Sequence, residues 1–380
     1  MLLLFLGEPI QLIVLYGALG AAFMPFLALT LLWLMNSSRV SKQHPAGQPR
    51  QNAWVTTAKQ VPVTVDMAGD ELDAEDAWHT IRKYGFFRLL VDSFVRFRFG
   101  DGFTNSRALA LQIALGVVPF LLAMTGLAAD LDEDQVAQVI ARTVSALTPG
   151  SGGNDLLANA IAPGETAERA GEIALAFGLA FAVVSMITAV AQIERGSNRI
   201  YGISRDRPAL WKYGRAGVLT LVLAVPTGAG FGLLVAGGPF GDAMQEIYGW
   251  SEVADRIWDV GRWPIGVAVT TFTIAVLLDH SPRRRQPGLS WLALGAGVSV
   301  VLTMVASALL GLYVNFSASF GGVYGPLAGV MALLLWCYLT SIAFFFGTAM
   351  AAQLEAMHAK VVEPTTGDPG AVQQRAANAG

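Results

Sequence analysis

The chain has 380 residues, of which 54% are apolar and only 14% are charged, well below the roughly one quarter that is usual in soluble domains. Its formal net charge of −3 argues against a nucleic-acid binder, because proteins of that class usually carry an excess of lysine and arginine. The single cysteine, Cys337, excludes a disulfide or a cysteine metal site within one chain.

Seven long segments are apolar and free of charged residues, which is typical of transmembrane helices. They are residues 10–35, 108–128, 173–193, 216–236, 263–278, 289–313 and 326–351. The sequence therefore predicts an all-α, polytopic helical membrane protein with a six-helix core and one extra N-terminal transmembrane helix, residues 1–35. A secretory signal peptide is a poor alternative for the first segment, because no basic residue precedes it.

Residues 36–85 begin with a stretch rich in Ser, Gln, Pro and Thr, followed by acids, so we expect a flexible cytoplasmic linker. The next segment, residues 86–99, has the pattern of an amphipathic helix. Its apolar and charged residues occupy different faces: Phe87, Leu90, Val91, Phe94 and Phe97 against Arg88, Asp92 and Arg96. We expect this helix to lie in the inner headgroup layer, the alternative being a soluble helix packed on the cytoplasmic loops. It opens the membrane domain, residues 86–355, which is followed by an expected disordered cytoplasmic tail, residues 356–380.

Proline and glycine interrupt two of the predicted spans. Pro119 lies in the second span, and Pro226 and Gly228 lie in a glycine-rich part of the fourth, where we predict a weakened or broken helix. Most proline kinks only shape a bundle, but a broken helix can also expose backbone carbonyl groups to a solute. If the chain has a solute pathway, we expect its lining to include Gln112, Pro119, Pro226, Gly228 and Tyr338.

In the sixth span, small residues recur every four positions. They are Gly295, Ser299, Thr303, Ser307 and Gly311. Such a ridge favours the close approach of a neighbouring helix.

Basic residues are divided unequally between the two sets of alternate loops. Of the 25 lysine and arginine residues, 21 lie in one set, which includes the Arg283 to Arg285 turn and the C-terminus. By the positive-inside rule, this set of loops is cytoplasmic. We expect the protein to lie in a bacterial inner (plasma) membrane. The acidic loops, residues 129–170 and 237–262, are then extracytoplasmic.

Three blocks of sequence occur in the same order as in a known family. The first runs from Arg107 to Leu122, and the second is Asn198-Arg-Ile-Tyr-Gly-Ile203, followed by Arg207-Pro208. The third, from Tyr324 to Leu354, contains Tyr-Gly-Pro-Leu-Ala-Gly and Leu-Trp-Cys-Tyr-Leu. Together they resemble the YihY/virulence factor BrkB family. The resemblance implies a six-helix inner-membrane protein of unestablished activity, whose former ribonuclease label is regarded as mistaken.

The chain also departs from the family pattern. Ala349, Ala351 and Gln353 stand where the family tends to have polar or acidic residues, so the resemblance does not support a mechanism that needs carboxylates at these positions. The first span is faintly similar to a terminal helix of Nramp-type metal permeases. One helix cannot supply the metal site of such a permease.

The sequence contains few candidates for chemistry. The four histidines are far apart and have no metal-ligand spacing, and neither a phosphate-binding loop nor a nucleophile elbow is present. We therefore expect no catalytic residue, no cofactor and no metal, and hence no enzyme. The basic motif Asn198, Arg199, Tyr201 and Arg207 is expected to contact lipid headgroups or to shape its loop.

These observations favour an integral inner-membrane protein that transports a small or lipid-like solute, with the bilayer and that solute as its partners. A transporter predicts a cavity bounded by Gln112, Pro226 and Tyr338. The alternative is a non-catalytic envelope scaffold or resistance factor, which predicts a solid bundle. A membrane-bound nuclease ranks last.

Overall fold

The computed structural model describes residues 60–64, 72–130, 139, 165–316 and 328–366. Residue contacts divide the chain into two compact units, Met1–Thr56 and Thr57–Gly380, and every described residue belongs to the second. The extra helix predicted at residues 1–35 therefore lies outside the described residues, as do most of loop 129–170 and the end of the tail.

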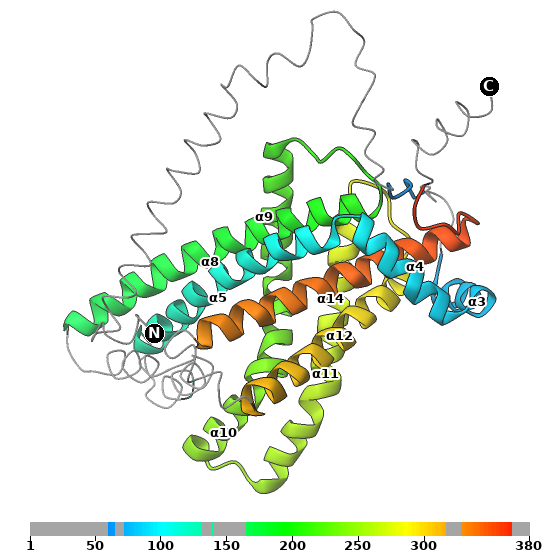
Figure 1. Cartoon of the computed structure of the whole chain (residues 1–380). Coiled ribbons are helices and arrows are strands. Elements are labelled where there is room, and N and C mark those ends of the chain that lie inside the picture. Colours follow the sequence, from blue (N-terminus) through cyan, green and yellow to red (C-terminus); the bar gives the residue numbers. More distant parts are fainter. Residues whose placement is uncertain (1–59, 65–71, 131–138, 140–164, 317–327, 367–380) are drawn as a thin grey trace, which may run out of the picture. The chain divides into compact units, whose positions relative to one another are not determined.

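All regular structure in the described residues is helical, which confirms the all-α fold class (Figure 1). The helices are α3 (Ala74–Tyr84), α4 (Phe86–Phe99), α5 (Gly102–Asp130), α8 (Glu165–Ile200), α9 (Ala209–Phe231), the π-helical η2 (Gly232–Ala236), α10 (Gly237–Tyr248), α11 (Glu252–His280), α12 (Leu289–Phe316) and α14 (Ala328–His358). Five helical stretches in the described residues are long and apolar enough to cross a membrane: Ala176–Ile200, Ala209–Tyr248, Glu252–His280, Leu289–Tyr313 and Val330–His358. The second predicted span, residues 108–128, coincides with α5.

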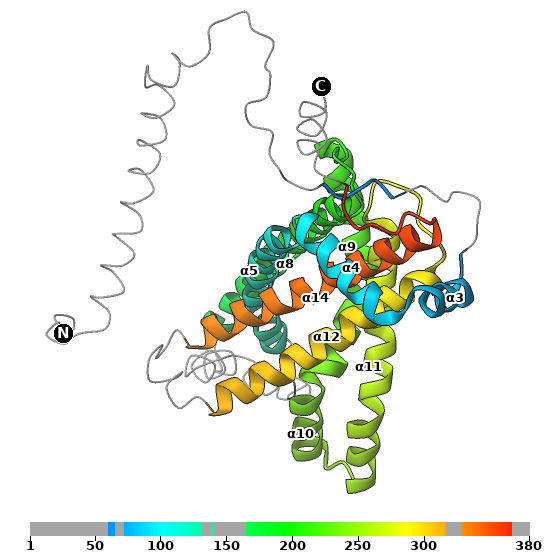
Figure 2. The ribbon, with the colours of Figure 1, turned by 45° about the vertical axis from the view of Figure 1, so that its right-hand side comes forward.

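The long helices α5, α8, α9, α11, α12 and α14 pack as a ring. Each contacts the long helix before and after it in the chain, and α14 closes the ring against α5. Figures 1 and 2 both show α14 between α5 and α12. Short connections, such as residues 201–208 and 281–288, favour this order because helices joined in this way pack as antiparallel neighbours.

α12 and α14 approach closely along the predicted small-residue ridge. A Cβ atom on Gly347 of α14 would collide with the Ser299 hydroxyl and the Gly295 carbonyl oxygen of α12. Farther along, Trp336 Nε1 donates to Ser307 Oγ at 2.9 Å. The ridge is therefore confirmed as the α12 side of this contact at Gly295, Ser299 and Ser307.

The proline and glycine positions weaken helices without breaking them. α5 is continuous through Pro119, and α9 is continuous through Pro226. Beyond Phe231 the glycine-rich segment forms η2, through which α9 passes into α10. A π-helical turn changes the register of a helix but keeps its backbone hydrogen-bonded.

Residues 74–84, which we expected to be part of a flexible linker, form α3. The Asp73 side chain caps this helix by accepting hydrogen bonds from the backbone N–H groups of Glu75 and Asp76, at 2.8 and 3.1 Å. Ala77 and Ile81 are buried against the bundle. The acidic composition that suggested a linker is here the first turn of a helix, where carboxylates are favourable.

The structure also differs from the expected disordered tail over residues 356–366. α14 continues to His358, and Gln353 Nε2 donates to the Val362 carbonyl oxygen at 2.9 Å. The backbone N–H of Thr366 donates to the Gln60 carbonyl oxygen at 2.8 Å. This part of the tail is therefore held by the bundle and by residues 60–64.

Candidate functional site

Helix α4 has different chemistry on its two sides. Phe87, Val91 and Phe94 are exposed on one side, whereas Arg96 on the other side is fully buried. The charged face predicted from the sequence therefore turns into the protein at Arg96. Phe97, which we placed on the apolar face with Phe87, Val91 and Phe94, is also buried and packs edge-on against Phe103, with 4.8 Å between ring centroids.

Arg96 connects α4 to three other parts of the chain. Its Nε donates to the Ile200 carbonyl oxygen at the end of α8 (3.0 Å), and its Nη1 donates to Gln353 Oε1 of α14 (3.2 Å). Its Nη2 donates to the Pro62 carbonyl oxygen (3.2 Å) and to Thr64 Oγ1. Burial lowers the pKa of Arg96 to about 10, so the side chain remains a cation at neutral pH.

A buried ion pair lies beside Arg96. Arg284 Nη1 is 2.7 Å from Glu355 Oε2, and their side chains are 7% and 1% exposed. The Arg284 guanidinium also stacks over the ring of Tyr201, 4.8 Å from its centroid. Burial raises the pKa of the Tyr201 hydroxyl, which therefore stays neutral at physiological pH. We call Arg96, Tyr201, Arg284, Gln353 and Glu355 the polar core.

Glu355 places a buried carboxylate at the end of the last helix, close to the positions where this chain lacks the polar residues of the family. Gln353, two residues earlier, is fully buried and accepts the hydrogen bond from Arg96. Ala349 and Ala351 are buried among apolar side chains. Glu355 follows a charge-free predicted span, so its burial could not be predicted from the composition of the spans.

The basic motif of the second block joins two loops. The Asn198 side chain donates to Asp206 Oδ1 (3.1 Å) and accepts from the backbone N–H of Arg283 (2.8 Å). Arg207 is paired with the buried Glu194 at 3.0 Å and donates to the carbonyl oxygens of residues 281 and 282. Asn198, Tyr201 and Arg207 thus hold the loop after α8 against the loop after α11.

Arg199 and Asp206 complete this motif. Arg199 Nη1 donates to the Ser204 carbonyl oxygen at 3.0 Å, a local contact within the loop. The pKa of the Asp206 carboxyl lies below its usual value, because its partial burial is outweighed by the hydrogen bond from Asn198 and by the positive charge of Lys212. These contacts support the loop-shaping interpretation of the motif. Headgroup binding by it stays a prediction.

The five predicted pathway residues lie on separate helix pairs. Gln112 and Tyr338 are half-buried on α5 and α14, which pack together, and Tyr338 lies against the cluster of Ala110, Ala114 and Cys337. Gln112 Oε1 is buried without a hydrogen bond to any described residue. Pro226 and Gly228 lie on α9, which packs against α8 and α11.

Pro119 lies at the contact of α5 with α8. A Cβ atom on Gly178 of α8 would be only 2.6 Å from the Pro119 carbonyl oxygen. Pro119 therefore accompanies a close helix approach. Its role in a solute pathway stays a prediction.

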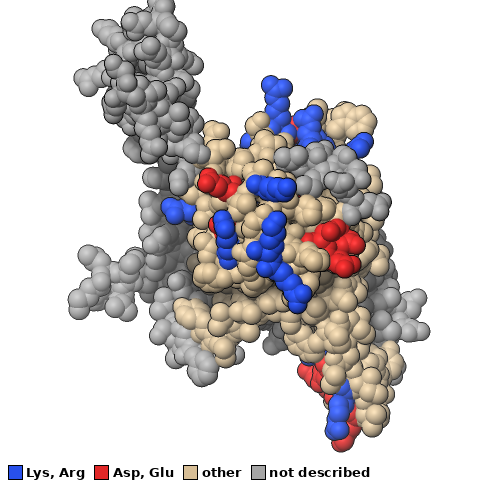
Figure 3. Space-filling view, turned by 90° about the vertical axis from the view of Figure 1, so that its right-hand side faces the viewer, with Lys and Arg blue, Asp and Glu red and all other residues tan. Residues whose placement is uncertain are grey.

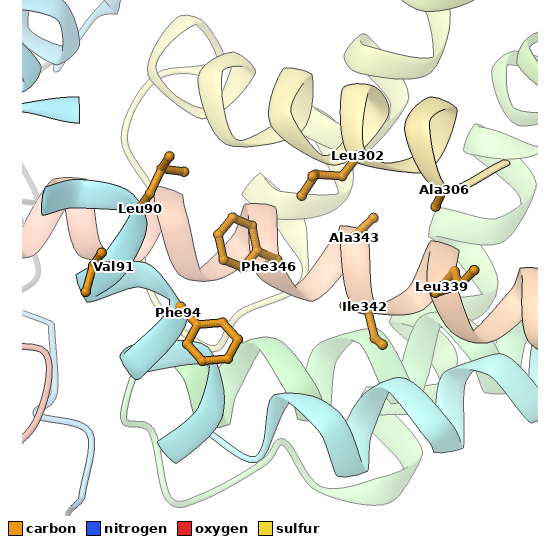
Figure 4. A pocket seen from close by; sticks show the side chains of 9 residues that line it. All are labelled: Leu90, Val91, Phe94, Leu302, Ala306, Leu339, Ile342, Ala343 and Phe346. Carbon is orange, nitrogen blue, oxygen red and sulfur yellow. The ribbon is translucent and has the colours of Figure 1, made fainter. Parts of the chain in front are cut away.

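An open apolar groove of about 530 Å³ lies between α4, α12 and α14 (Figure 4). Its volume is within the roughly 300–1,000 Å³ of ordinary ligand sites. Every lining side chain is apolar: Leu90, Val91 and Phe94 of α4, Leu302 and Ala306 of α12, and Leu339, Ile342, Ala343 and Phe346 of α14. In the parts of the chain that the structure describes, no three His, Cys, Asp or Glu side chains gather as metal ligands would.

The ring of long apolar helices defines a multi-pass helical membrane protein. The model of the virulence factor BrkB family matches residues 93–369, so the chain belongs to that family. This confirms the resemblance drawn from the three sequence blocks. The match begins within α4 and includes all the long helices.

The chain is similar in sequence to proteins from several bacteria. The ribonuclease-like protein YfkH of Bacillus subtilis is 26% identical over 267 residues, which cover 70% of this chain and 94% of that protein. A UPF0761 membrane protein of Idiomarina loihiensis is 26% identical over 193 residues, 50% of this chain and 64% of that protein. Another, from Chromohalobacter salexigens, is 25% identical over 280 residues, 73% of this chain and 64% of that protein. No solved structure matches this chain.

Proposed function

We propose that this protein binds a lipid-like solute in the groove and moves it across the inner (plasma) membrane. The lining of the groove carries the proposal, because all nine side chains are apolar and six of them belong to the membrane-spanning helices α12 and α14. A polar solute requires several polar groups in the lining of its site. The groove therefore favours a lipid-like solute over a polar small molecule.

The orientation of the protein is part of this proposal. The unequal distribution of lysine and arginine supports a cytoplasmic polar core and C-terminus, with residues 237–262 on the opposite side. In Figure 3, lysine and arginine side chains gather on the face where α3 and α4 lie. The α4 end of the groove would then open at the level of the inner leaflet.

A non-catalytic envelope scaffold or resistance factor is the second candidate. It is favoured by the close packing of α5 on α14 around Tyr338 and by the position of Pro226 on a different helix pair. A membrane-bound nuclease ranks third, because it requires acidic or histidine side chains that converge at one face.

The test is lipid movement in liposomes that contain the purified protein and a fluorescent phospholipid. We expect the labelled lipid to reach a membrane-impermeant quencher faster than in protein-free liposomes. Ala306→Phe should slow this movement several-fold, because the added ring occupies the groove. Val301→Phe is the matched control, since Val301 is exposed on α12 and does not line the groove.

The outcomes separate the three candidates. Equal rates with and without the protein would reject lipid movement and make the scaffold the leading candidate. Equal rates for Ala306→Phe and the wild type would reject the groove as the route. Cleavage of RNA by the purified protein, stopped by a chelator, would instead support the nuclease.

A further inference from the structure

Arg98 is an exposed cation on the face of α4 that borders the groove. It follows Phe94 by four residues and Val91 by seven, so the three share one helical face. Its guanidinium lies 5.6 Å from the centroid of the Phe99 ring, and no acidic side chain in the described part of the chain forms an ion pair with it. Arg88, in contrast, is 3.5 Å from Asp92.

The chemistry of this face is that of an amphiphile site. The groove offers only apolar contacts, and Arg98 adds a positive charge one helical turn beyond Phe94. A guanidinium can donate two parallel hydrogen bonds to a phosphate, which makes arginine a favoured phosphate ligand. The nearest acidic residue on α4, Asp92, is already paired with Arg88, so it is not available to a choline or ethanolamine group.

The exposed part of α4 also sets the depth of the site. Phe87, Val91 and Phe94 are exposed on one stripe, as in helices that rest at the boundary of headgroups and acyl chains. An arginine on such a helix reaches the phosphate layer with its charged end while its stem stays among apolar groups. A chain that enters the groove at α4 would continue between α12 and α14 toward Ala306 (Figure 4).

We propose that the groove binds one acyl chain of an anionic phospholipid whose phosphate is held by Arg98. This inference rests on the proposed function and names the solute class of the same groove. Arg98 favours anionic over zwitterionic lipids, because the guanidinium that holds the phosphate repels the ammonium group of a zwitterionic headgroup, and the groove retains the chain of either. The occupant comes from the bilayer, because the groove opens on apolar helix faces.

The experiment is native mass spectrometry of the full-length protein released from membranes that contain equal amounts of phosphatidylglycerol and phosphatidylcholine. We expect the wild type to retain more phosphatidylglycerol, by about fivefold, which corresponds to roughly 1 kcal/mol for one basic residue near the surface. Arg98→Gln should bring the ratio of the two lipids close to one, and Arg98→Lys should keep most of the preference. Arg82→Gln, at an exposed arginine of α3 that does not line the groove, is the matched control and should keep the wild-type ratio.

The variants also separate this inference from the proposed function. Ala306→Phe should reduce the retention of both lipids, because it fills the shared part of the groove. If the wild type moves lipids but Arg98→Gln leaves the lipid ratio unchanged, the headgroup assignment is wrong and the proposed function stands. If inorganic phosphate raises the melting temperature of delipidated wild type but not of Arg98→Gln, the site takes a free anion, which overturns the phospholipid assignment.

Discussion

Arg96 of α4 donates to Gln353 of α14 across 3.2 Å, and both side chains are completely shielded from solvent. Two residues before Arg96, and therefore on nearly the opposite face of the helix, Phe94 lines the groove. The polar core thus holds the helix that forms one wall of the apolar site. Stability of the polar core and occupancy of the groove should depend on each other for this reason.

Replacement of Arg96 tests how much the polar core contributes to stability. Arg96→Met removes four hydrogen bonds and leaves the Gln353 and Thr64 oxygens without their donor, so we expect a loss of about 2–4 kcal/mol in stability. Arg96→Lys should lose an intermediate amount of stability, because a lysine ammonium keeps the positive charge but lacks the planar guanidinium that donates to several acceptors at once. Thermal unfolding of the purified protein in detergent measures the effect. Arg88→Met, on the exposed side of α4, should change the midpoint little, and an equal loss for both variants would contradict the role of Arg96.

The Arg284 and Glu355 pair should behave as a buried ion pair. Glu355→Gln removes the carboxylate beside a buried guanidinium, and such losses cost about 3–5 kcal/mol. The double variant Arg284→Met/Glu355→Gln should be less destabilised than the sum of Arg284→Met and Glu355→Gln, because neither member of the pair is then left without its partner. The unfolding midpoints of the wild type, the two single variants and the double variant form a double-mutant cycle. Additive losses would show that the two side chains do not interact.

The sequence predicted the six long helices well because membrane spans are recognisable from local composition. Charge-free stretches identified α5, α8, α9, α11, α12 and α14, and the four-residue spacing of small side chains identified the α12 contact surface. Both signals lie within one helix. They need no knowledge of what packs against it.

The polar core and the groove could not be found in this way. A helical wheel separates Arg96 from Phe94 but cannot show that the charged side meets buried acceptors from Pro62, Ile200 and Gln353, which are distant in sequence. The groove likewise combines three helices. Helix α3, which we expected to be part of a linker, does have a local signal in the sequence. Asp73 and Asp76 are three residues apart, which is the spacing of a capping box.

Among the glycines of the α12–α14 contact, Gly347 should be the one whose replacement by alanine lowers stability most. In Gly347→Ala, the new methyl group would overlap the Ser299 hydroxyl and the Gly295 carbonyl oxygen, and overpacking of this kind costs about 1–3 kcal/mol. Gly297→Ala on α12 is the matched control, since a Cβ atom there meets nothing within 4 Å. Thermal unfolding should show a clear loss for the first variant only. Equal midpoints would mean that the two helices separate easily at this point.

Asp206 should make stability depend on acid pH. Its pKa is lower in the folded protein than in the unfolded chain, so its contribution is present above the unfolded pKa, near 4, and is lost as the pH falls through the folded pKa. Asp206→Asn should therefore lower the unfolding midpoint at pH 7, and the gap to the wild type should close on acidification below about pH 4. Asp259→Asn, at an exposed carboxylate, should leave no comparable gap. A gap that persists at low pH would assign the effect to lost packing.

The orientation proposed from the basic residues can be tested with two exposed positions at opposite ends of α11 and its following loop. In a Cys337→Ala background, Arg285→Cys should react with a membrane-impermeant maleimide only after the cells are permeabilised, whereas Glu252→Cys should react in intact spheroplasts. The reason is the concentration of lysine and arginine on the Arg285 side, which the positive-inside rule places in the cytoplasm. The opposite labelling pattern would show that the protein has the reverse orientation in the membrane. Arg98 and the α4 end of the groove would then face the outer leaflet, and the lipid that they bind would have to be drawn from there.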